Sequence, residues 1–266
     1  MSKIIATSVA VGDLPPLHDI AGADGMLFVH ANEGIATKGA FARVEPAKVH
    51  ALLSSIECRY TDEHDAAGPI ALGFLPFLRE EQEDFFVPSV FARRFSDGYS
   101  SITVCTDAQM PEEARRTYIE EVIASITASP PVAAHEQCGE RHLSSAPLTP
   151  ISTYLAAVSE ARSAVRSGQI EKAVIARDIE LISDTPLNIH SVVQFLHHQY
   201  STCYQFSIDN MVGASPELLI QLEKGMAHSN PLAGTTPRTG DPAIDAQNAA
   251  DRAAVAKGEV DKLVKQ

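Results

Sequence analysis

Lys172 is the first residue whose type and surroundings suit acid–base chemistry. It begins the run Lys-Ala-Val-Ile-Ala-Arg-Asp-Ile-Glu-Leu-Ile over 172–182, in which β-branched residues predict a strand. Side chains alternate between the two faces of a strand, so Lys172 would share a face with Val174 and Ala176. A lysine with an ordinary pKa of about 10.4 is neutral in about one molecule in a few thousand at pH 7, and apolar surroundings raise that fraction. Lys172 is a candidate general base; the alternative is a strand-end lysine whose ammonium extends into water.

Glu217 is the second candidate, within Gly-Ala-Ser-Pro-Glu-Leu-Leu over 213–219. The pattern predicts a Gly/Ser/Pro turn followed directly by an apolar strand. We expect Glu217 at a sheet edge that opens onto a cavity, where Leu218 and Leu219 would raise the pKa of its carboxyl toward that of a general acid. The alternative is a solvated glutamate beside a turn.

A second compact turn, Pro-Leu-Ala-Gly-Thr, is predicted over 231–235. Gly234 has no side chain to keep an anionic ligand away from the backbone N–H groups. By itself the motif also fits an ordinary hairpin corner.

In this order and spacing, the three segments identify a protein family more specifically than any one of them does alone. The chain from about Thr149 to Asp245 resembles the chorismate-utilising enzymes, and within them the isochorismate synthases. A fainter resemblance upstream rests on Gly-Phe-Leu-Pro-Phe over 73–77 and on Val87-Pro88, which look like the sheet-forming N-terminal half of that family.

The resemblance implies a magnesium-dependent reaction in which water adds at ring carbon 2 of chorismate while the hydroxyl on carbon 4 leaves. By motif match, Lys172 is the base that activates water and Glu217 is the acid that protonates the departing hydroxyl. Gly234 and Thr235 match the turn that holds the substrate. The residue types suit these tasks, because a water nucleophile needs a proton acceptor and a poor leaving group needs a proton donor.

Two related activities differ at single positions. The anthranilate and aminodeoxychorismate synthases, which use ammonia, are similar but do not carry lysine at the position of Lys172. Salicylate synthases share the lysine but tend to carry an aromatic residue where Ala214 stands here. The resemblance therefore favours isochorismate as the product and keeps salicylate as the alternative, while leaving open whether the product serves menaquinone, siderophore or salicylate synthesis.

The expected metal site departs from the family pattern. In the family, a lysine-acidic stretch after the Pro-Leu-Ala-Gly turn ends in Glu-His, and that glutamate binds magnesium. Here the stretch Lys257-Gly-Glu-Val-Asp-Lys262 puts Asp261 at the metal position and Lys262 in place of the histidine. Aspartate is a hard oxygen ligand suited to Mg²⁺, but its side chain is shorter and the adjacent lysine opposes cation binding. The alternative is a solvated helix charge.

The elements that would position these residues follow from periodicity and from turn signals. Their order indicates a chain that mixes strands and helices, and the resemblance implies an α+β fold, a sandwich of largely antiparallel sheets flanked by helices, with a sheet-rich half over 1–147 and the first part of a catalytic half over 148–266. The predicted elements are antiparallel strands within 26–46 and 69–105, a helix from Pro111 to near Ser129, a linker over 130–147, a helix over 150–167, a strand over 172–182, a helix from Ile189, strands near 203–208 and 217–222, and a helix from Asp245.

Composition excludes several classes of protein. The 266 residues are 45% hydrophobic, and 34 acidic against 21 basic side chains give a net charge of −13, so a sizeable core is expected and nucleic acid or an anionic membrane is not an expected partner. The absence of a secretory leader or membrane span predicts a cytoplasmic protein. The cysteines and histidines show no metal-site spacing, so free thiols are expected at Cys58, Cys105, Cys138 and Cys203, and surface positions are expected for His64, His197 and His198.

Members of the family continue beyond the last predicted helix with strands that complete the sheets. Residues 1–266 by themselves would therefore expose sheet edges and apolar faces, and association through those edges is expected. A non-catalytic lobe that binds a partner chain is thus a third hypothesis, beside the isochorismate-forming and salicylate-forming enzymes.

Overall fold

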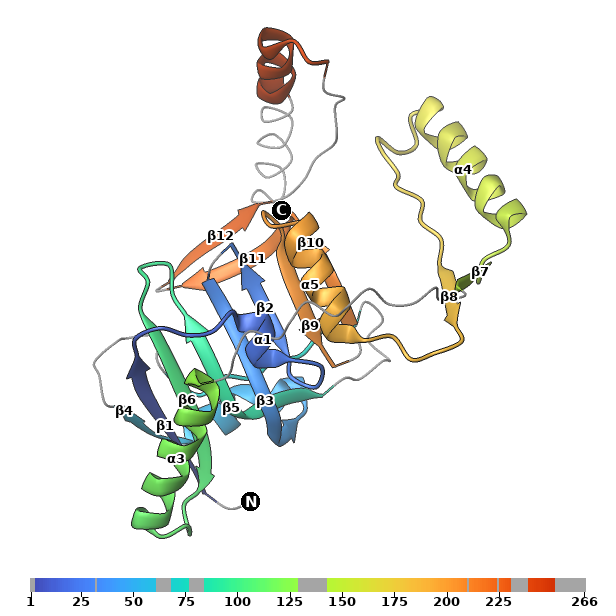
Figure 1. The fold of residues 1–266 in the computed structure, drawn as a ribbon. Helices are drawn as coiled ribbons and strands as arrows, with labels where there is room; N and C mark the ends of the chain where they lie inside the picture. Colours follow the sequence, from blue (N-terminus) through green and yellow to red (C-terminus); the bar gives the residue numbers. More distant parts are fainter. Residues whose placement is uncertain are drawn as a thin grey trace. The chain divides into compact units, whose positions relative to one another are not determined.

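The computed structural model describes residues 3–31, 33–60, 68–76, 84–128, 143–209, 211–223, 225–230 and 239–251 (Figure 1). The chain divides into two compact units, a larger one of residues 1–132 and 189–266 and a smaller one of residues 133–188. The boundary predicted at 147/148 falls inside the smaller unit. The division into a sheet-rich half and a catalytic half stays a prediction.

The larger unit is built on an eight-stranded sheet with the order β10-β9-β2-β3-β5-β6-β1-β4 (Figure 1). Its neighbouring strands are antiparallel except for β1 and β4, which are parallel. The strands are β1 (Ile4–Val11), β2 (Leu27–His30), β3 (Glu33–Val44), β4 (Glu57–Tyr60), β5 (Phe85–Arg94), β6 (Ser100–Asp107), β9 (Tyr204–Ile208) and β10 (Met211–Ser215). The strands predicted within 26–46 and 69–105 are confirmed as β2, β3, β5 and β6.

The centre of this sheet is buried because β5 and β6 are rich in β-branched and aromatic residues. Val90 lies opposite Val104, and Ala92 lies opposite Ile102. All four side chains are buried in one cluster on the same face of the sheet. Alternation thus gives these strands one face to pack under helices.

In the described part of the larger unit, three helices pack on that face of the sheet (Figure 1), and a fourth contributes to the cluster on the other face. Ile20 of α1, Ile119 and Ile126 of α3, and Val193 of α5 belong to the first cluster. The helices are α1 (Leu17–Ala21), α3 (Glu112–Thr127) and α5 (Ile189–Gln199) on the first face, and α2 (Val49–Ser55), preceded by the 3-10 turn η1 (Pro46–Lys48), on the second. The helices predicted from Pro111 and from Ile189 are confirmed as α3 and α5.

The described residues of the smaller unit, 143–188, form one helix and a two-stranded sheet. The helix α4 (Ile151–Arg166) confirms the prediction over 150–167, and it begins directly after Pro150, which is pre-organised for a first turn. The strands β7 (Leu143–Pro147) and β8 (Ile179–Ser183) are antiparallel. The predicted linker over 130–147 is therefore wrong at residues 143–147, because these residues pair with β8; residues 129–142 lie outside the described part of the chain.

The chain returns from the smaller unit through α5 into β9 and β10, and β9 pairs with β2. One sheet thus contains strands from both predicted halves. A separate hairpin follows, formed by β11 (Leu218–Glu223) and β12 (Met226–Asn230). The strands predicted near 203–208 and 217–222 are confirmed as β9 and β11, and residues 242–251 are helical, in agreement with the helix predicted from Asp245.

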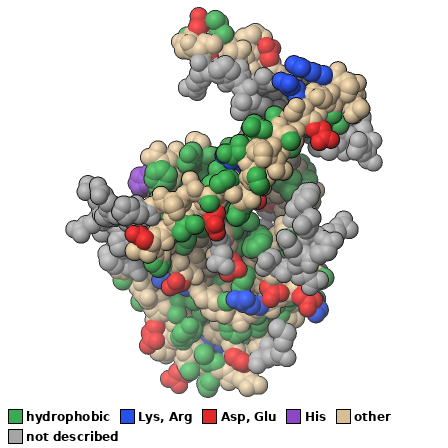
Figure 2. Space-filling view, turned by 90° about the vertical axis from the view of Figure 1, so that its right-hand side faces the viewer, with side chains coloured by type: hydrophobic (Ala, Val, Ile, Leu, Met, Phe, Trp, Pro, Cys, Tyr) green, Lys and Arg blue, Asp and Glu red, His purple; other side chains and the backbone are tan. Residues whose placement is uncertain are grey.

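Large apolar side chains lie at the surface of both units. Ile151, Leu155 and Val158, which share one face of α4, are 36–58% exposed, and Leu219 on β11 is 84% exposed. Figure 2 shows hydrophobic side chains interspersed with charged ones over one face of the molecule. Such surface is available to pack against further polypeptide. In the described ranges, no helix is long and apolar enough to cross a membrane.

Candidate functional site

Glu217 lies at the junction between β10 and β11, and its side chain is exposed. The Oγ atom of Ser215 accepts a hydrogen bond from the Glu217 backbone N–H at 3.2 Å. This bond closes a local turn around Pro216, which fixes where the Glu217 backbone leaves the large sheet. Glu217 therefore follows β10, an edge strand of the large sheet, and is exposed, while the cavity expected beside it stays a prediction.

The turn predicted at the start of this motif is shorter than expected. Gly213, Ala214 and Ser215 are strand residues that pair with Phe206, Gln205 and Tyr204 of β9. Gly213 is also required by packing, since a Cβ atom there would lie 2.7 Å from Cζ of Phe206. Gly and Ser were interpreted as turn formers, whereas pairing with β9 makes them part of the sheet.

Lys172 lies in the smaller unit, in the segment between α4 and β8, and it is exposed. The strand predicted over 172–182 forms only at Ile179–Ser183, because β7 pairs with those five residues. Among the described residues, no strand pairs with 172–178. The apolar face predicted around Lys172 is also wrong within this unit, since Val174 is 82% exposed.

The segment that carries Lys172 is nevertheless attached to its own unit. The guanidinium of Arg177 lies over the Tyr154 ring, 5.7 Å from the ring centroid. The backbone N–H of Leu148 donates to the carbonyl oxygen of Asp178 at 3.1 Å. These contacts join the end of the segment to α4 and to the residue after β7.

The structure therefore positions Lys172 and Glu217 separately, each within its own unit. Gly234 and Thr235 fall within residues 231–238, and Asp261 falls within residues 252–266, which lie outside the described residues. Their roles stay predictions. In the described portion of the chain, no group of three or more His, Cys, Asp or Glu side chains is arranged to hold a metal ion.

The cysteines behave as the spacing predicted. Cys58, Cys105 and Cys203 are free thiols, and Cys138 lies outside the described residues. Burial raises the pKa of the Cys105 thiol to about 11, so this residue is an unreactive core group at neutral pH.

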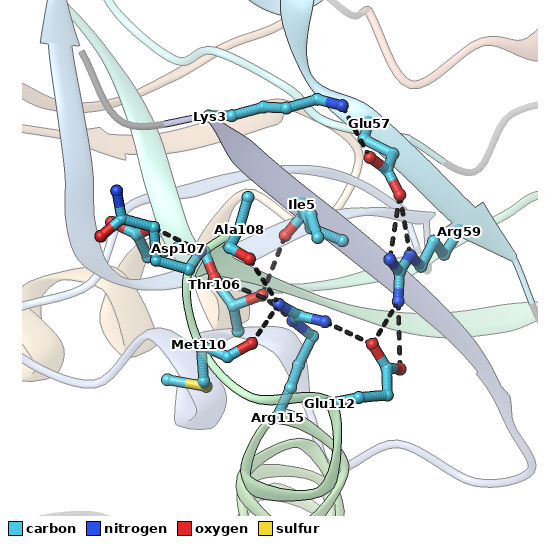
Figure 3. Close-up of polar contacts among 11 residues, drawn as sticks. Lys3, Ile5, Glu57, Arg59, Thr106, Asp107, Ala108, Met110, Glu112 and Arg115 are labelled. Carbon is cyan, nitrogen blue, oxygen red and sulfur yellow. Dashed lines mark hydrogen bonds and ion pairs between the residues drawn. The ribbon is translucent and has the colours of Figure 1, made fainter.

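A polar network centred on Arg115 ties α3 to the sheet (Figure 3). Arg115 is 3% exposed, and its Nε donates to Thr106 Oγ1 at 3.1 Å. Its Nη2 donates to the carbonyl oxygens of Met110 at 2.6 Å and of Asp107 and Ala108 at 3.3 Å. The Arg115 guanidinium thus provides hydrogen-bond donors for three backbone carbonyls at the end of β6 and in the connection to α3. Its role is structural.

The same network continues to the sheet edge through exposed ion pairs (Figure 3). Glu112 accepts from Arg115 at 2.6 Å and from Arg59 at 2.8 Å, and Glu57 accepts from Arg59 and Lys3 at 3.0 Å. Hydrogen bonds from Lys3 and Arg59 lower the pKa of the Glu57 carboxyl, and those from Arg59 lower the pKa of the Glu112 carboxyl. These charges align α3 with β4.

Of the two α5 histidines predicted at the surface, His198 is exposed as predicted, whereas His197 is partly buried. The ring of His197 lies 4.8 Å from the ring of His18, centroid to centroid, and its Nδ1 lies 3.1 Å from Oε1 of Gln205. His190 is 4% exposed. The sequence separation between α1 and α5 hid this contact, and His64 lies outside the described residues.

Comparison with known proteins supports one family. The profile of the family described as chorismate binding enzyme matches residues 21–259. Isochorismate synthase MenF of Bacillus subtilis (strain 168) is 29% identical over 190 residues, which are 66% of this chain and 40% of MenF. Isochorismate synthase DhbC of the same strain is 31% identical over 115 residues, which are 39% of this chain and 29% of DhbC.

A solved structure agrees with the fold. The crystal structure assigned to 2,3-dihydroxybenzoate-specific isochorismate synthase DhbC of Bacillus anthracis matches with a TM-score of 0.56 and 20% identity, over 89% of this chain and 56% of that chain. The matched parts of this chain thus span from 29% to 56% of the length of these relatives. The α+β fold with largely antiparallel sheets is confirmed. Because the family profile covers nearly all of its length, this chain belongs to the chorismate binding enzyme family.

Proposed function

We propose that this chain acts in an isochorismate synthase, which converts chorismate to isochorismate. The observation that carries the proposal is Lys172, in the run Glu-Lys-Ala-Val-Ile-Ala-Arg, upstream of Glu217 in Gly-Ala-Ser-Pro-Glu. Relatives named isochorismate synthase support it. Lysine at position 172 is also the feature that the resemblance associates with using water rather than ammonia.

In the proposed mechanism, Lys172 in its neutral form accepts a proton from the water that adds at ring carbon 2. Glu217 in its protonated form donates a proton to the carbon 4 hydroxyl, which leaves as water while the ring double bond shifts. One water is consumed and one is released, so the product is an isomer of the substrate. Gly234 and Thr235 would hold the substrate through their turn.

The surroundings of Lys172 put one condition on this mechanism. Lys172 is exposed in the described structure, whereas a lysine acts as a base only in its neutral form, which burial or a nearby cation favours. We infer that bound substrate, together with polypeptide packed on the exposed apolar surfaces, excludes bulk water from Lys172 during the reaction and leaves in place the one water that reacts.

Magnesium and the cellular setting belong to the same proposal. Asp261 would be one ligand of Mg²⁺, and its carboxylate oxygen suits this cation. We place the activity in the cytoplasm, without nucleic-acid or membrane partners, and association through the edges of the sheet stays a proposal.

The proposal is tested by incubating the purified protein with chorismate and Mg²⁺ and separating the products by chromatography. We expect isochorismate from the native protein and from Lys48→Ala, a control that removes an exposed lysine on a different element. We expect none from Lys172→Ala, with an unchanged urea midpoint because Lys172 is not in the core. Turnover that survives in Lys172→Ala, or fluorescent salicylate as the direct product, would overturn the assignment.

A further inference from the structure

A cluster of three histidines joins α1 to α5 within the larger unit. The histidine cluster consists of His18 from α1 and of His190 and His197 from α5, with His198 at its edge. The ring of His18 lies 4.8 Å from that of His197 and 6.3 Å from that of His190, between centroids. The ring of His198 lies 5.9 Å from that of His197.

One carboxylate, that of Asp19, lies close to two of these imidazoles. Oδ1 of Asp19 lies 3.6 Å from Nε2 of His18 and 3.5 Å from Nε2 of His190. The Asp19 side chain is 6% exposed, and its Oδ1 also accepts a hydrogen bond from Nε2 of Gln194 at 3.4 Å. A single buried negative charge can balance one imidazolium, so a second protonation in the cluster is not compensated.

His190 and His197 differ in their hydrogen-bond partners. His190 is 4% exposed, and neither of its ring nitrogens has a hydrogen-bond partner among the described residues. Nε2 of Gln205 donates to the Tyr200 carbonyl at 3.0 Å, which turns Oε1 of Gln205 toward His197. Nδ1 of His197 therefore donates to Oε1 of Gln205 at 3.1 Å.

The charges facing the cluster from neighbouring elements do not offset further protonation. His18, His197 and Arg94 of β5 line one cavity of about 240 Å³. The Arg94 guanidinium donates to the carbonyl oxygens of Leu14 at 2.8 Å and Pro15 at 3.3 Å. The side chains that β2, β9 and β10 direct to this face of the sheet are uncharged, namely Leu27, Val29, Gln205, Ser207 and Val212, while Lys38 of β3 lines a separate cavity beneath α3.

We propose that the histidine cluster is a pH-sensitive contact, which holds α5 against α1 near neutral pH and weakens when the imidazoles are protonated. With neutral rings, the charges at the contact are Asp19 and Arg94, which balance. With His18, His190 and His197 protonated, three positive charges are added in a buried space. Because α5 is the first element after the smaller unit, this contact also anchors the point where the chain re-enters the larger unit.

The pKa of His18 is shifted in the direction that a pH-sensitive contact requires. Burial lowers the pKa of His18 below its ordinary value, and the charges of His197, His190 and His198 lower it further, against an opposing effect of Asp19. A histidine whose folded pKa is lowered binds protons more readily in the unfolded chain. Its stabilising contribution is therefore present above the unfolded pKa of about 6.5 and decreases as the pH falls below it.

The first experiment is urea unfolding of the full chain at pH 7.5, 6.5 and 5.5, in buffer containing EDTA. We expect the unfolding equilibrium constant to rise about tenfold or more between pH 7.5 and 5.5. His18→Gln should reduce that rise because it removes the ring whose pKa is lowered, and His190→Leu should reduce it because it removes one of the charges that lower the pKa of His18. His50→Gln, an exposed position on α2, should leave the rise unchanged. An equal rise in the native chain and in both cluster variants would overturn the proposal.

A second measurement needs no variant. Hydrogen exchange of the native chain, corrected for the intrinsic effect of pH, reports local opening of each helix. We expect residues 189–199 of α5 to lose protection between pH 7.5 and 5.5, while residues 112–127 of α3, on the same face of the sheet, keep it. Equal retention of protection in both helices would contradict a contact controlled by the histidines.

Discussion

Replacing Arg115 by methionine tests how α3 is held on the sheet. Arg115 is 3% exposed, and methionine keeps much of the apolar stem while it removes every donor. The variant would leave the Met110 carbonyl and the Thr106 hydroxyl without the bonds of 2.6 and 3.1 Å that Arg115 provides. Thr106 lies near the end of β6 and Met110 lies in the connection from β6 to α3, so the loss of these bonds acts directly on the docking of the helix.

The expected cost follows from those two bonds. A hydrogen bond from a charged donor contributes about 1.5 kcal/mol or more, so the two short bonds together contribute about 3 kcal/mol. The two bonds of 3.3 Å add little. The ion pair with Glu112 is left out of the sum, because the Glu112 side chain is 72% exposed and water screens it.

The assay is urea unfolding followed by far-ultraviolet circular dichroism at pH 7.5. With a slope of about 2 kcal/mol per molar urea, a loss of about 3 kcal/mol lowers the midpoint by roughly 1.5 M. Arg116→Met is the matched control, since the Arg116 side chain is 81% exposed and its ion pair with Glu120 lies on the surface. A midpoint for Arg115→Met that equals that of Arg116→Met would refute the reasoning.

Two further predictions concern carboxylates. Glu217→Gln should lower kcat for chorismate with little change in the urea midpoint, because the amide cannot donate the proton that the leaving hydroxyl needs; unchanged kcat at all pH values would remove Glu217 from the mechanism. The lowered pKa values of Glu57 and Glu112 mean that their stabilising contribution is present above the unfolded pKa of about 4.5 and is lost as the pH falls below it. Stability measured from pH 5 to pH 3 should thus fall less steeply in Glu57→Gln and Glu112→Gln than in Glu113→Gln, and equal slopes would contradict the network.

The sequence predicted the elements whose signals are local. Pro150 and the apolar spacing after it predicted α4, and the apolar residues of α3 predicted a helix that packs through Ile119 and Ile126. The β-branched and aromatic residues of β5 and β6 predicted central strands in the same way. In each case the residues that form the element also carry its signal.

Pairing over long sequence distances was not predictable. The strand expected from Lys172 is confined to Ile179–Ser183, because the partner strand β7 lies more than thirty residues earlier in the chain. Gly213 and Ser215 suggested a turn, but their pairing with β9 places them in the sheet. The contact between His18 and His197 joins two helices that the sequence separates by the whole smaller unit. Composition indicates that a segment can form a strand, and the fold decides where it pairs.

The candidate site shows the same division between local and distant information. Lys172 and Glu217 were identified from motifs, that is, from residue types in a fixed order. Their exposure could not be predicted, since it depends on what packs over each segment. The short turn that Ser215 forms with Glu217 is a local feature that the motif contains, and its hydroxyl could have been assigned a positioning role from the sequence.

Turnover of chorismate in water enriched in ¹⁸O tests the central claim most directly. The proposed chemistry adds a solvent oxygen at carbon 2 and releases the original hydroxyl from carbon 4. The account predicts isochorismate that is two mass units heavier by mass spectrometry, with the label at carbon 2, and no such product from Lys172→Ala. Unlabelled isochorismate, or no isochorismate from the native protein with Mg²⁺ present, would contradict it.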